Sequence, residues 1–349
     1  MSSGSVAEFA SGSALLSRLQ AGGQWFVIAD FEGRLRGWRF EDVTSAPRDL
    51  PATPAWRGPD ADAWVSSHTA EQYQQAVART REHVADGTVY QANICRVLSA
   101  SLDKPHSPAA LTDIFAHGNP APFLGYIRVT STVPEEQVWL ASASPELFIR
   151  ISPDAGGALI ESSPIKGTAV NRDGLTDKDT AENVMITDLV RNDVSPVCEP
   201  GTVAVRNFLN VEEHPGLVHL VSTVEGRVSP ETFASDDFWQ RVFDATFPPG
   251  SVSGAPKSSA LRIISELESH PRGPYCGGFG WVDGDTGRAE LAVGIRSFWW
   301  ERHCASCGGP ALHFGTGAGI TWGSDPVREW EETQLKASRL IALASGGSV

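Results

Sequence analysis

Two kinds of hydrophobic pattern alternate along the chain. Short, mostly apolar runs bounded by turn-forming residues predict strands, whereas apolar residues spaced three and four apart predict helices. Strands are expected at 25–29, 89–100, 123–129, 138–143, 147–151, 217–228, 279–282, 289–300 and 311–314. Helices are expected after Thr69 up to Asp86, and at 176–193, 258–269 and 326–343. Many strands with irregularly interspersed helices indicate an α+β fold rather than regular βαβ winding.

Composition and charge narrow the classes of function. The 349 residues carry 28 Lys+Arg against 42 Asp+Glu, a net charge of −14. Binding to nucleic acid in general or to an anionic membrane needs a basic surface, so neither partner is expected. Five scattered cysteines and an N-terminus without a signal-peptide pattern favour a cytoplasmic location. An anionic substrate would therefore need a locally positive pocket or a bridging metal.

Two predicted helices carry paired acids at helical spacing. Asp179 and Glu182 share a stripe with apolar residues on the 176–193 helix, and Glu329 and Glu332 lie near the start of the last helix. Such a set of carboxylates suits Mg²⁺, which takes a few oxygen ligands and retains water. The alternative is that these acids only complement the dipole at each helix N-terminus.

Two glycine-rich segments could bind an anion. Residues 250–257 lack the Gly-Lys-Ser/Thr order of a phosphate loop, but their glycines precede a helix that begins near Lys257. The turn expected at 315–319 lacks the third glycine of a dinucleotide fingerprint, yet its N–H groups could form an anion nest. A plain turn explains each segment equally well.

Lysine and cysteine chemistry leaves two further alternatives open. Lys166 lies between Pro164 and Gly167, where a partly buried amine could act as a nucleophile, although a surface loop is the simpler interpretation. Cys304 and Cys307, with His303 and His313 nearby, could seed a zinc site. The second ligand pair of such a site is not evident, so an exposed hairpin is favoured there.

Ten segments together are far more specific than any one of them. They are VYQANI at 89–94, SPELF at 144–148, PIKGT at 164–168, AENVMITDLVRND at 181–193, CEPGT at 198–202, HLVST at 219–223, FPPGSVSGAPK at 247–257, YCG at 275–277, GIR at 294–296 and WEET at 330–333. In this order they resemble the chorismate-utilising enzymes over about residues 69–342, and among these most nearly the aminodeoxychorismate synthases, component I. The resemblance implies two stacked, mostly antiparallel sheets with helices outside and the active site in the cleft between them.

The resemblance also implies a ligand set. Glu182 and Glu332 would bind Mg²⁺, with Asp179 and Glu329 binding it directly or through water. The metal would hold the ring carboxylate of chorismate. Arg296, Tyr275 and the backbone of Gly317, Ala318 and Gly319 would bind the second carboxylate. Lys257 would supply positive charge at the site.

The remaining motif residues imply the chemistry. Lys166 would add to C2 of the ring while Glu146 protonates the departing C4 hydroxyl; ammonia would then add at C4 and expel the lysine. His219 and Thr168 would line the ring. Gln91 matches the glutamine of the ammonia-using members, and lysine in PIKGT is similar to the aminodeoxychorismate synthases, where anthranilate synthases usually carry alanine.

Partners and alternatives follow from the same resemblance. Ammonia would come from a glutamine amidotransferase subunit, and a separate lyase would convert the product to 4-aminobenzoate, a folate precursor. Residues 69–349 would form the chorismate-binding catalytic domain, with 1–68 a shortened segment packed on it that lacks the usual tryptophan-binding segment. The alternatives are an anthranilate synthase component I, an aminodeoxyisochorismate synthase, or a catalytically silent regulatory subunit.

Overall fold

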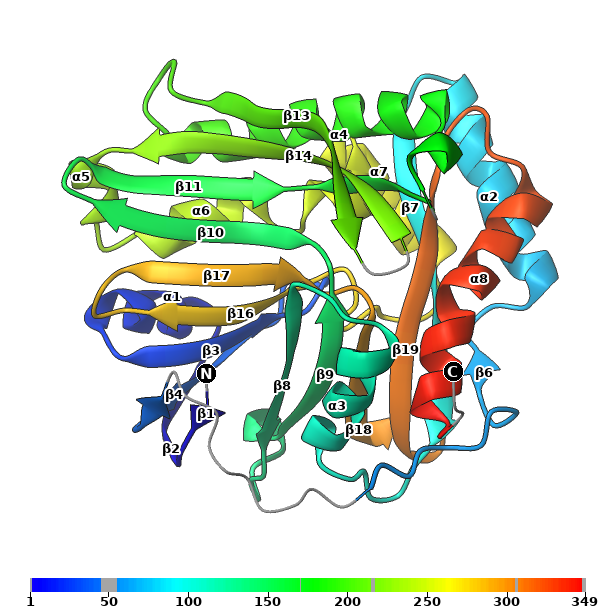
Figure 1. The fold of residues 1–349 in the computed structure, drawn as a ribbon, viewed down its shortest axis with the longest axis horizontal. Coiled ribbons are helices and arrows are strands. Elements are labelled where there is room, and N and C mark those ends of the chain that lie inside the picture. Colours follow the sequence, from blue (N-terminus) through cyan, green and yellow to red (C-terminus); the bar gives the residue numbers. More distant parts are fainter. Residues whose placement is uncertain (1, 45–54, 170, 215–216, 305–306, 347–349) are drawn as a thin grey trace.

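The computed structural model describes residues 2–44, 55–169, 171–214, 217–304 and 307–346; the side chains of residues 2, 3, 168, 214 and 217 are not among those described. Figure 1 shows two large sheets whose strands run nearly at right angles in this view. The strands are β1 Ser2–Ser3, β2 Val6–Ser11, β3 Gln24–Ala29, β4 Leu35–Phe40, β5 Val43–Thr44, β6 Val65–Ser66, β7 Gln91–Ser101, β8 Phe123–Val129, β9 Val138–Ser144, β10 Leu147–Asp154, β11 Gly157–Ser163, β12 Ile165–Ala169, β13 Ala204–His214, β14 Leu217–Val228, β15 Gly254–Ala255, β16 Gly278–Asp283, β17 Arg288–Val293, β18 Ser297–Cys304 and β19 Gly309–Ile320. The helices are α1 Gly12–Ala21, α2 Ala70–Ala85, α3 Pro108–Gly118, α4 Asp177–Val194, α5 Pro230–Phe233, α6 Phe238–Thr246, α7 Lys257–Leu267 and α8 Pro326–Ala344.

Both sheets are antiparallel in every described strand pair. The ten-stranded sheet has the order β12-β14-β11-β10-β17-β16-β3-β4-β2, with β13 also on β14. The seven-stranded sheet has the order β15-β7-β19-β18-β9-β8, with β6 on β7. The largest apolar cluster contains residues from both sheets, so the main core lies between them. The expected fold, an α+β architecture of two antiparallel sheets with helices, is confirmed.

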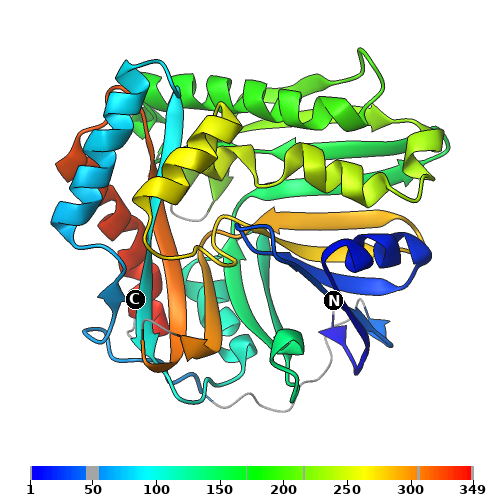
Figure 2. The same ribbon diagram turned by 180° about the vertical axis from the view of Figure 1, so that it is seen from behind.

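The helices cover the outer faces of the sheets. Seen from behind, α1 and α6 lie side by side over the ten-stranded sheet, while α2 and α8 flank the seven-stranded one (Figure 2). Strands β2, β3 and β4 extend the ten-stranded sheet because β3 pairs with β16. Among the residues that the model describes, no helix combines the length and apolar character that a membrane crossing requires.

The predicted bounds of several elements agree with the structure to within two residues. Helix α2 begins after Thr69, whose side chain accepts the Gln72 N–H while the Gln72 side chain accepts the Thr69 N–H. Strands β8 and β14 have the predicted bounds, and α4, α7 and α8 differ from prediction by one or two residues. Helices α1, α3 and α6 were not predicted, because each is short and its apolar positions were not separated from neighbouring strand-like runs.

Two predictions in the C-terminal third are wrong. The strand expected over 289–300 is two strands, β17 and β18, which belong to different sheets and are separated by a bend at Gly294–Arg296. The turn expected at Gly315–Gly319 is the second half of β19, which continues to Ile320 and pairs with β7 throughout. Tertiary pairing overrides the turn preference of these glycines.

The bends between the sheets are the feature that matters for function. Strand β9 passes into β10 and β17 passes into β18, so two neighbouring chain segments cross from one sheet to the other. Glu146 lies at the first bend and Arg296 at the second. Hydrogen bonds join the bends: Val293 N–H donates to the Glu146 carbonyl at 3.0 Å, and Ala143 N–H donates to the Arg296 carbonyl at 3.0 Å.

Candidate active site

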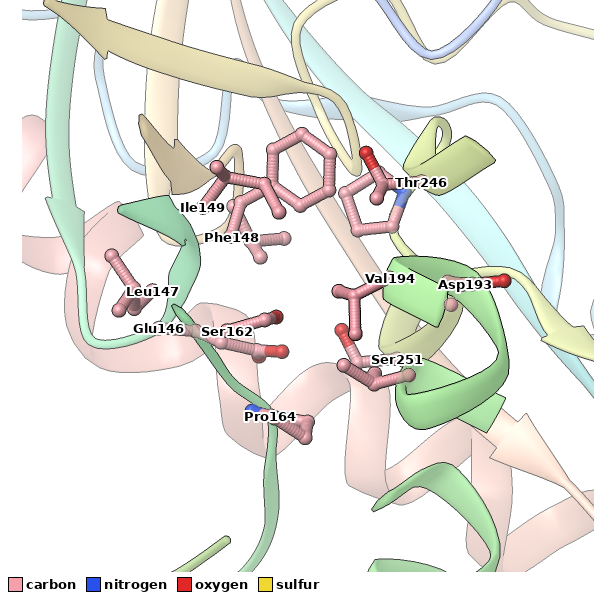
Figure 3. Close-up of a pocket in the computed structure, with 14 residues that line it drawn as sticks. Glu146, Leu147, Phe148, Ile149, Ser162, Pro164, Asp193, Val194, Thr246 and Ser251 are labelled. Carbon is pink, nitrogen blue, oxygen red and sulfur yellow. The ribbon is translucent and has the colours of Figure 1, made fainter. Parts of the chain in front are cut away.

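Glu146 is a buried acid, and its burial changes the pKa of its carboxyl group. Only 3% of the residue is exposed, and its side chain enters a narrow pocket from the same side as Ser162, with Ser251 on the other side (Figure 3). Burial raises the pKa of Glu146 to about 7, although Ser251, Lys166 and Arg296 act in the opposite direction. A carboxyl group with this pKa can give up a proton near neutral pH.

Lys166 faces the same site from β12. Its Nζ donates a hydrogen bond to the Ser251 carbonyl at 2.9 Å. Burial lowers the pKa of Lys166, while the nearby carboxylates of Glu182 and Glu146 favour its charged form. The following residue, Gly167, has φ +83°, and a Cβ there would lie 2.8 Å from Asp179 Cβ. The lysine is therefore held against the start of α4 by an irregular position of β12 that only glycine fits well.

Three acids from two helices form the centre of the site. Glu182 on α4 is partly buried, and Glu329 on α8 has a side chain only 4% exposed. Lys178 Nζ lies 3.7 Å from Glu182 and 3.5 Å from Glu329, so one ammonium group bridges the two helices. Glu332, also on α8, pairs with Lys336 at 2.6 Å, which lowers its pKa despite partial burial.

Two carboxylate oxygens in this cluster are buried without a hydrogen-bond donor. They are Glu182 Oε1 and Glu329 Oε2, counted over the described residues. Burial raises the pKa of Glu182, against the opposing effect of Lys166 and Lys178. Buried anionic oxygens without donors are the type of group that binds a hard cation.

Asp179 has a local structural task. Its carboxylate accepts hydrogen bonds from the Thr176 N–H at 2.8 Å and the Thr176 hydroxyl at 2.6 Å, which caps α4. The second acid expected on this helix is thus already supplied with two donors. Glu182, Glu329 and Glu332 come together around Lys178, while Asp179 lies beside Gly167 at the edge of the group.

The glycines of β19 make room for side chains from other elements. A Cβ on Gly319 would lie 2.0 Å from Gln91 Nε2, and one on Gly315 would lie 2.0 Å from the Tyr275 ring. Gln91 is buried, and its Oε1 has no hydrogen-bond partner in the described part of the chain. Tyr275 is packed beneath β19 rather than pointing at the acids, and burial raises its pKa well above the ordinary value.

The last part of β19 also has an open backbone edge. Beyond Phe314 its described pairing is with β7 alone, whereas β18 pairs only up to that residue. Lys336 Nζ donates to the Gly317 carbonyl at 3.2 Å, so the Gly317 backbone faces the open edge. Successive residues of a strand direct their backbone groups to opposite edges, so those of Ala318 face β7.

Three predicted residues lie elsewhere around the site. Lys257, the first residue of α7, pairs with Asp193 at 2.8 Å and donates to the Thr246 carbonyl at 3.0 Å, so its charge is already compensated. Burial raises the pKa of Asp193 to about 6 against the effect of Lys257. His219 is buried on β14, opposite Thr168 of β12. The Thr168 side chain lies outside the described residues.

Sequence reasoning missed three groups in this site. Lys178 and Lys336 lie four residues from Glu182 and Glu332 on the same helices, a spacing that signals an ion pair and could have been recognised. Ser251 acts on Lys166 through its backbone carbonyl, for which a sequence carries no residue-type signal. Together the site combines a protonatable acid, a partly buried amine and an acid cluster suited to a cation.

Known proteins resemble this chain in sequence and in fold. Anthranilate synthase component 1 of Aquifex aeolicus is 33% identical over 297 residues, covering 81% of this chain and 55% of that protein. The enzyme of the same name from Haloferax volcanii is 36% identical over 279 residues, covering 78% and 50%. The chain thus spans about half the length of these curated relatives. The crystal structure of anthranilate synthase component I from Streptococcus pneumoniae superposes with a TM-score of 0.74 at 22% identity, covering 94% of this chain and 84% of that one.

The family itself is shown by a match over most of the chain. The family model for chorismate binding enzymes matches residues 38–342, a range that contains Glu146, Lys166 and all three clustered acids. The relatives above agree with this match, since they exceed 30% identity over more than two thirds of the chain. On these grounds the chain belongs to the chorismate-binding enzymes.

Proposed function

We propose that the protein aminates chorismate at C4 with ammonia, giving 4-amino-4-deoxychorismate. The observation that carries this proposal is the position of Lys166. Its Nζ donates a hydrogen bond to the Ser251 carbonyl at 2.9 Å, and burial lowers its pKa although Glu182 and Glu146 favour the charged form. A neutral amine beside a protonated carboxyl group is the pair that this reaction requires.

The acids around Lys178 are the candidate ligands for Mg²⁺. The donor-free buried oxygens of Glu182 and Glu329, together with Glu332, would hold the ion. Bound Mg²⁺ would supply positive charge for one substrate carboxylate. The competing ligand in the free protein is Lys178, whose ammonium lies between the same two buried acids.

The second substrate carboxylate would bind on the other side of the site. Arg296 lies at the bend next to Glu146, and burial lowers its pKa without removing its charge near neutral pH. The open edge of β19 offers backbone N–H groups at Gly317 and Gly319. A guanidinium and amide donors in a partly buried site bind a carboxylate well, which explains how an acidic protein accepts an anion.

The covalent step can be written from these residues. The neutral Lys166 amine forms a bond to C2, the two ring double bonds shift, and the C4–O bond breaks. Glu146 gives its proton to the departing oxygen, which leaves as water. Ammonia then forms a bond to C4, the double bonds shift back, and the bond from C2 to Lys166 breaks. A lysine that occupies C2 also prevents ammonia from adding there.

The nitrogen source and the product's fate follow from the chemistry. Gln91 lies against Gly319, and its buried Oε1, which has no hydrogen-bond partner among the described residues, could accept a hydrogen bond from incoming ammonia. The ammonia would come from a glutamine amidotransferase subunit, and a lyase would convert the product to 4-aminobenzoate for folate synthesis. A cytoplasmic location fits these partners.

Anthranilate synthesis is the second candidate. The relatives named above carry that name, which favours amination at C2 with loss of pyruvate. The two functions use the same substrate, metal and nitrogen source and differ in the carbon that is aminated. Lys166 favours C4, and the names of the relatives favour C2.

Product identification separates the two. The purified protein is incubated with chorismate, Mg²⁺ and ammonium salts at alkaline pH, and the products are identified by mass and by adding the lyase. The expected product retains the pyruvyl group and yields 4-aminobenzoate only after the lyase is added. Anthranilate together with free pyruvate would contradict the first proposal and support the second.

Substitution of the lysine tests the mechanism separately. Lys166→Ala should bind chorismate but lose most product formation, and Lys166→Arg should not restore it because a guanidinium stays protonated. Lys104→Ala, at an exposed lysine, is the matched control. If Lys166→Ala aminates C4 at a near-normal rate with abundant ammonia, the covalent role is wrong even though the product is right.

A further inference from the structure

A second cluster of potential metal ligands lies in the hairpin formed by β18 and β19. Strand β18 ends at Cys304, and β19 begins at Gly309 after a short connection. The Sγ atoms of Cys304 and Cys307 and a ring nitrogen of His313 all lie within 4.8 Å of one another. Among the described residues, these three side chains place their potential metal-binding atoms closest to the arrangement of a metal site. The activity proposed above does not use them.

His313 is oriented as a ligand would be. Its side chain is 1% exposed, and its Nδ1 lies 2.8 Å from the Ser99 hydroxyl. The ring stacks on Trp299, with centroids 5.3 Å apart and planes at 24°. These contacts leave Nε2, which has no hydrogen-bond partner among the described residues. An unpartnered buried nitrogen is costly, whereas a nitrogen fixed by a hydrogen bond on the other ring atom is the usual arrangement for metal binding.

A fourth potential ligand lies beside the His313 ring. The Glu301 carboxylate lies 3.7 Å from Nε2, on the neighbouring strand β18. A carboxylate at this distance can occupy another position on the same ion, directly or through water.

The two cysteines have the spacing of a zinc-binding pair. Cys304 is buried, Cys307 is half-buried, and the Cys307 N–H donates to Cys304 Sγ at 3.2 Å. In this structure the two sulfurs form a disulfide. A dithiol reductant would convert it to two thiols while itself becoming a disulfide. Binding of Zn²⁺ then releases one proton from each thiol, because thiolates are the ligands.

We propose that, once this disulfide is reduced, Cys304, Cys307 and His313 Nε2 bind Zn²⁺, with Glu301 completing a tetrahedral set directly or through water. The ion would close the β18–β19 hairpin, and the disulfide would close it in the oxidised protein. The site is structural and shares no residue with the acid cluster or with Glu146. It does not depend on which carbon of chorismate is aminated.

The test measures metal content rather than activity. The full-length protein is reduced with dithiothreitol, incubated with Zn²⁺, dialysed anaerobically and analysed by mass spectrometry for metals. The expected content is about one zinc per chain. Cys304→Ser and His313→Asn should lose it; the asparagine can keep the Ser99 contact but lacks Nε2. Cys198→Ser, at a free half-buried thiol, is the matched control and should retain it.

Oxidation of the unmodified chain gives a control that does not depend on a variant folding. Wild-type protein with the disulfide re-formed should bind no zinc and should recover binding after reduction. Cobalt in place of zinc should give thiolate-to-cobalt charge-transfer absorption only in the reduced protein. The proposal is overturned if reduced protein holds no zinc, if oxidised protein holds as much as reduced protein, or if Cys304→Ser retains the metal.

Discussion

The titration of Glu146 gives a prediction whose size follows from the structure. Burial raises its pKa from 4.5 to about 7. At about 1.36 kcal/mol for each tenfold change in proton affinity, ionisation of Glu146 costs the folded protein about 3 kcal/mol. The pKa is raised in the folded state, so the associated stability is fully present below pH 4.5 and is lost as pH rises through about 7. Glu146→Gln keeps the shape and removes the ionisation.

The assay compares unfolding free energies of the two proteins over pH. Urea denaturation is measured for wild type and Glu146→Gln at closely spaced values from about pH 4 to 9. Subtracting one curve from the other cancels groups that both proteins share. The variant should gain stability relative to wild type as pH rises through 5 to 7, reaching about 3 kcal/mol and then levelling off. A difference that stays constant over this range would refute the assigned pKa and its cause.

Three further predictions concern the cation site and the packing of β19. Glu182→Gln should greatly weaken Mg²⁺ binding measured by calorimetry, whereas Glu331→Gln, at an exposed position on the neighbouring helix α8, should leave it unchanged. Lys178→Met should strengthen Mg²⁺ binding, because its ammonium lies where a cation would be attracted; weaker binding would show instead that the lysine supports the site. Gly315→Ala should lower the thermal midpoint and cost about 1–3 kcal/mol or more, since its Cβ would meet the Tyr275 ring at 2.0 Å. Gly125→Ala, where a Cβ meets nothing within 4 Å, is its control, and equal stability of the two variants would contradict the packing argument.

Local sequence signals determined the ends of several helices. Thr69 with Gln72, and Thr176 with Asp179, each form a capping box, and Asp325 caps α8 just before a proline. These interactions span three residues or fewer, so they can be recognised in the sequence. The motif order also identified the acid pairs and Lys166 as candidates, because the residue types at those positions were enough to show the resemblance.

The sequence alone also predicted the fold class correctly but not the path of the strands between the sheets. The run from 289 to 300 is mostly apolar, and a strand in either sheet would have the same pattern. The bend at Gly294 arises because its backbone packs on Pro274, where a Cβ would lie 2.0 Å from the carbonyl oxygen. Pro274 lies outside the strand pattern around Gly294, and hydrophobic periodicity does not encode a contact with it.

Only the tertiary structure decided which groups of the site meet. Glu146 and Arg296 are 150 positions apart and come together because two neighbouring strand pairs bend at the same level between the sheets. The glycines of β19 have a turn-like composition but lie in a strand, since Gln91 and Tyr275 fill the space that side chains would take. Periodicity records whether a position is buried, whereas the identity of its neighbour depends on long-range packing. The sequence by itself therefore determined the chemical groups available to this protein, and the packing of the two sheets determined how those groups are combined.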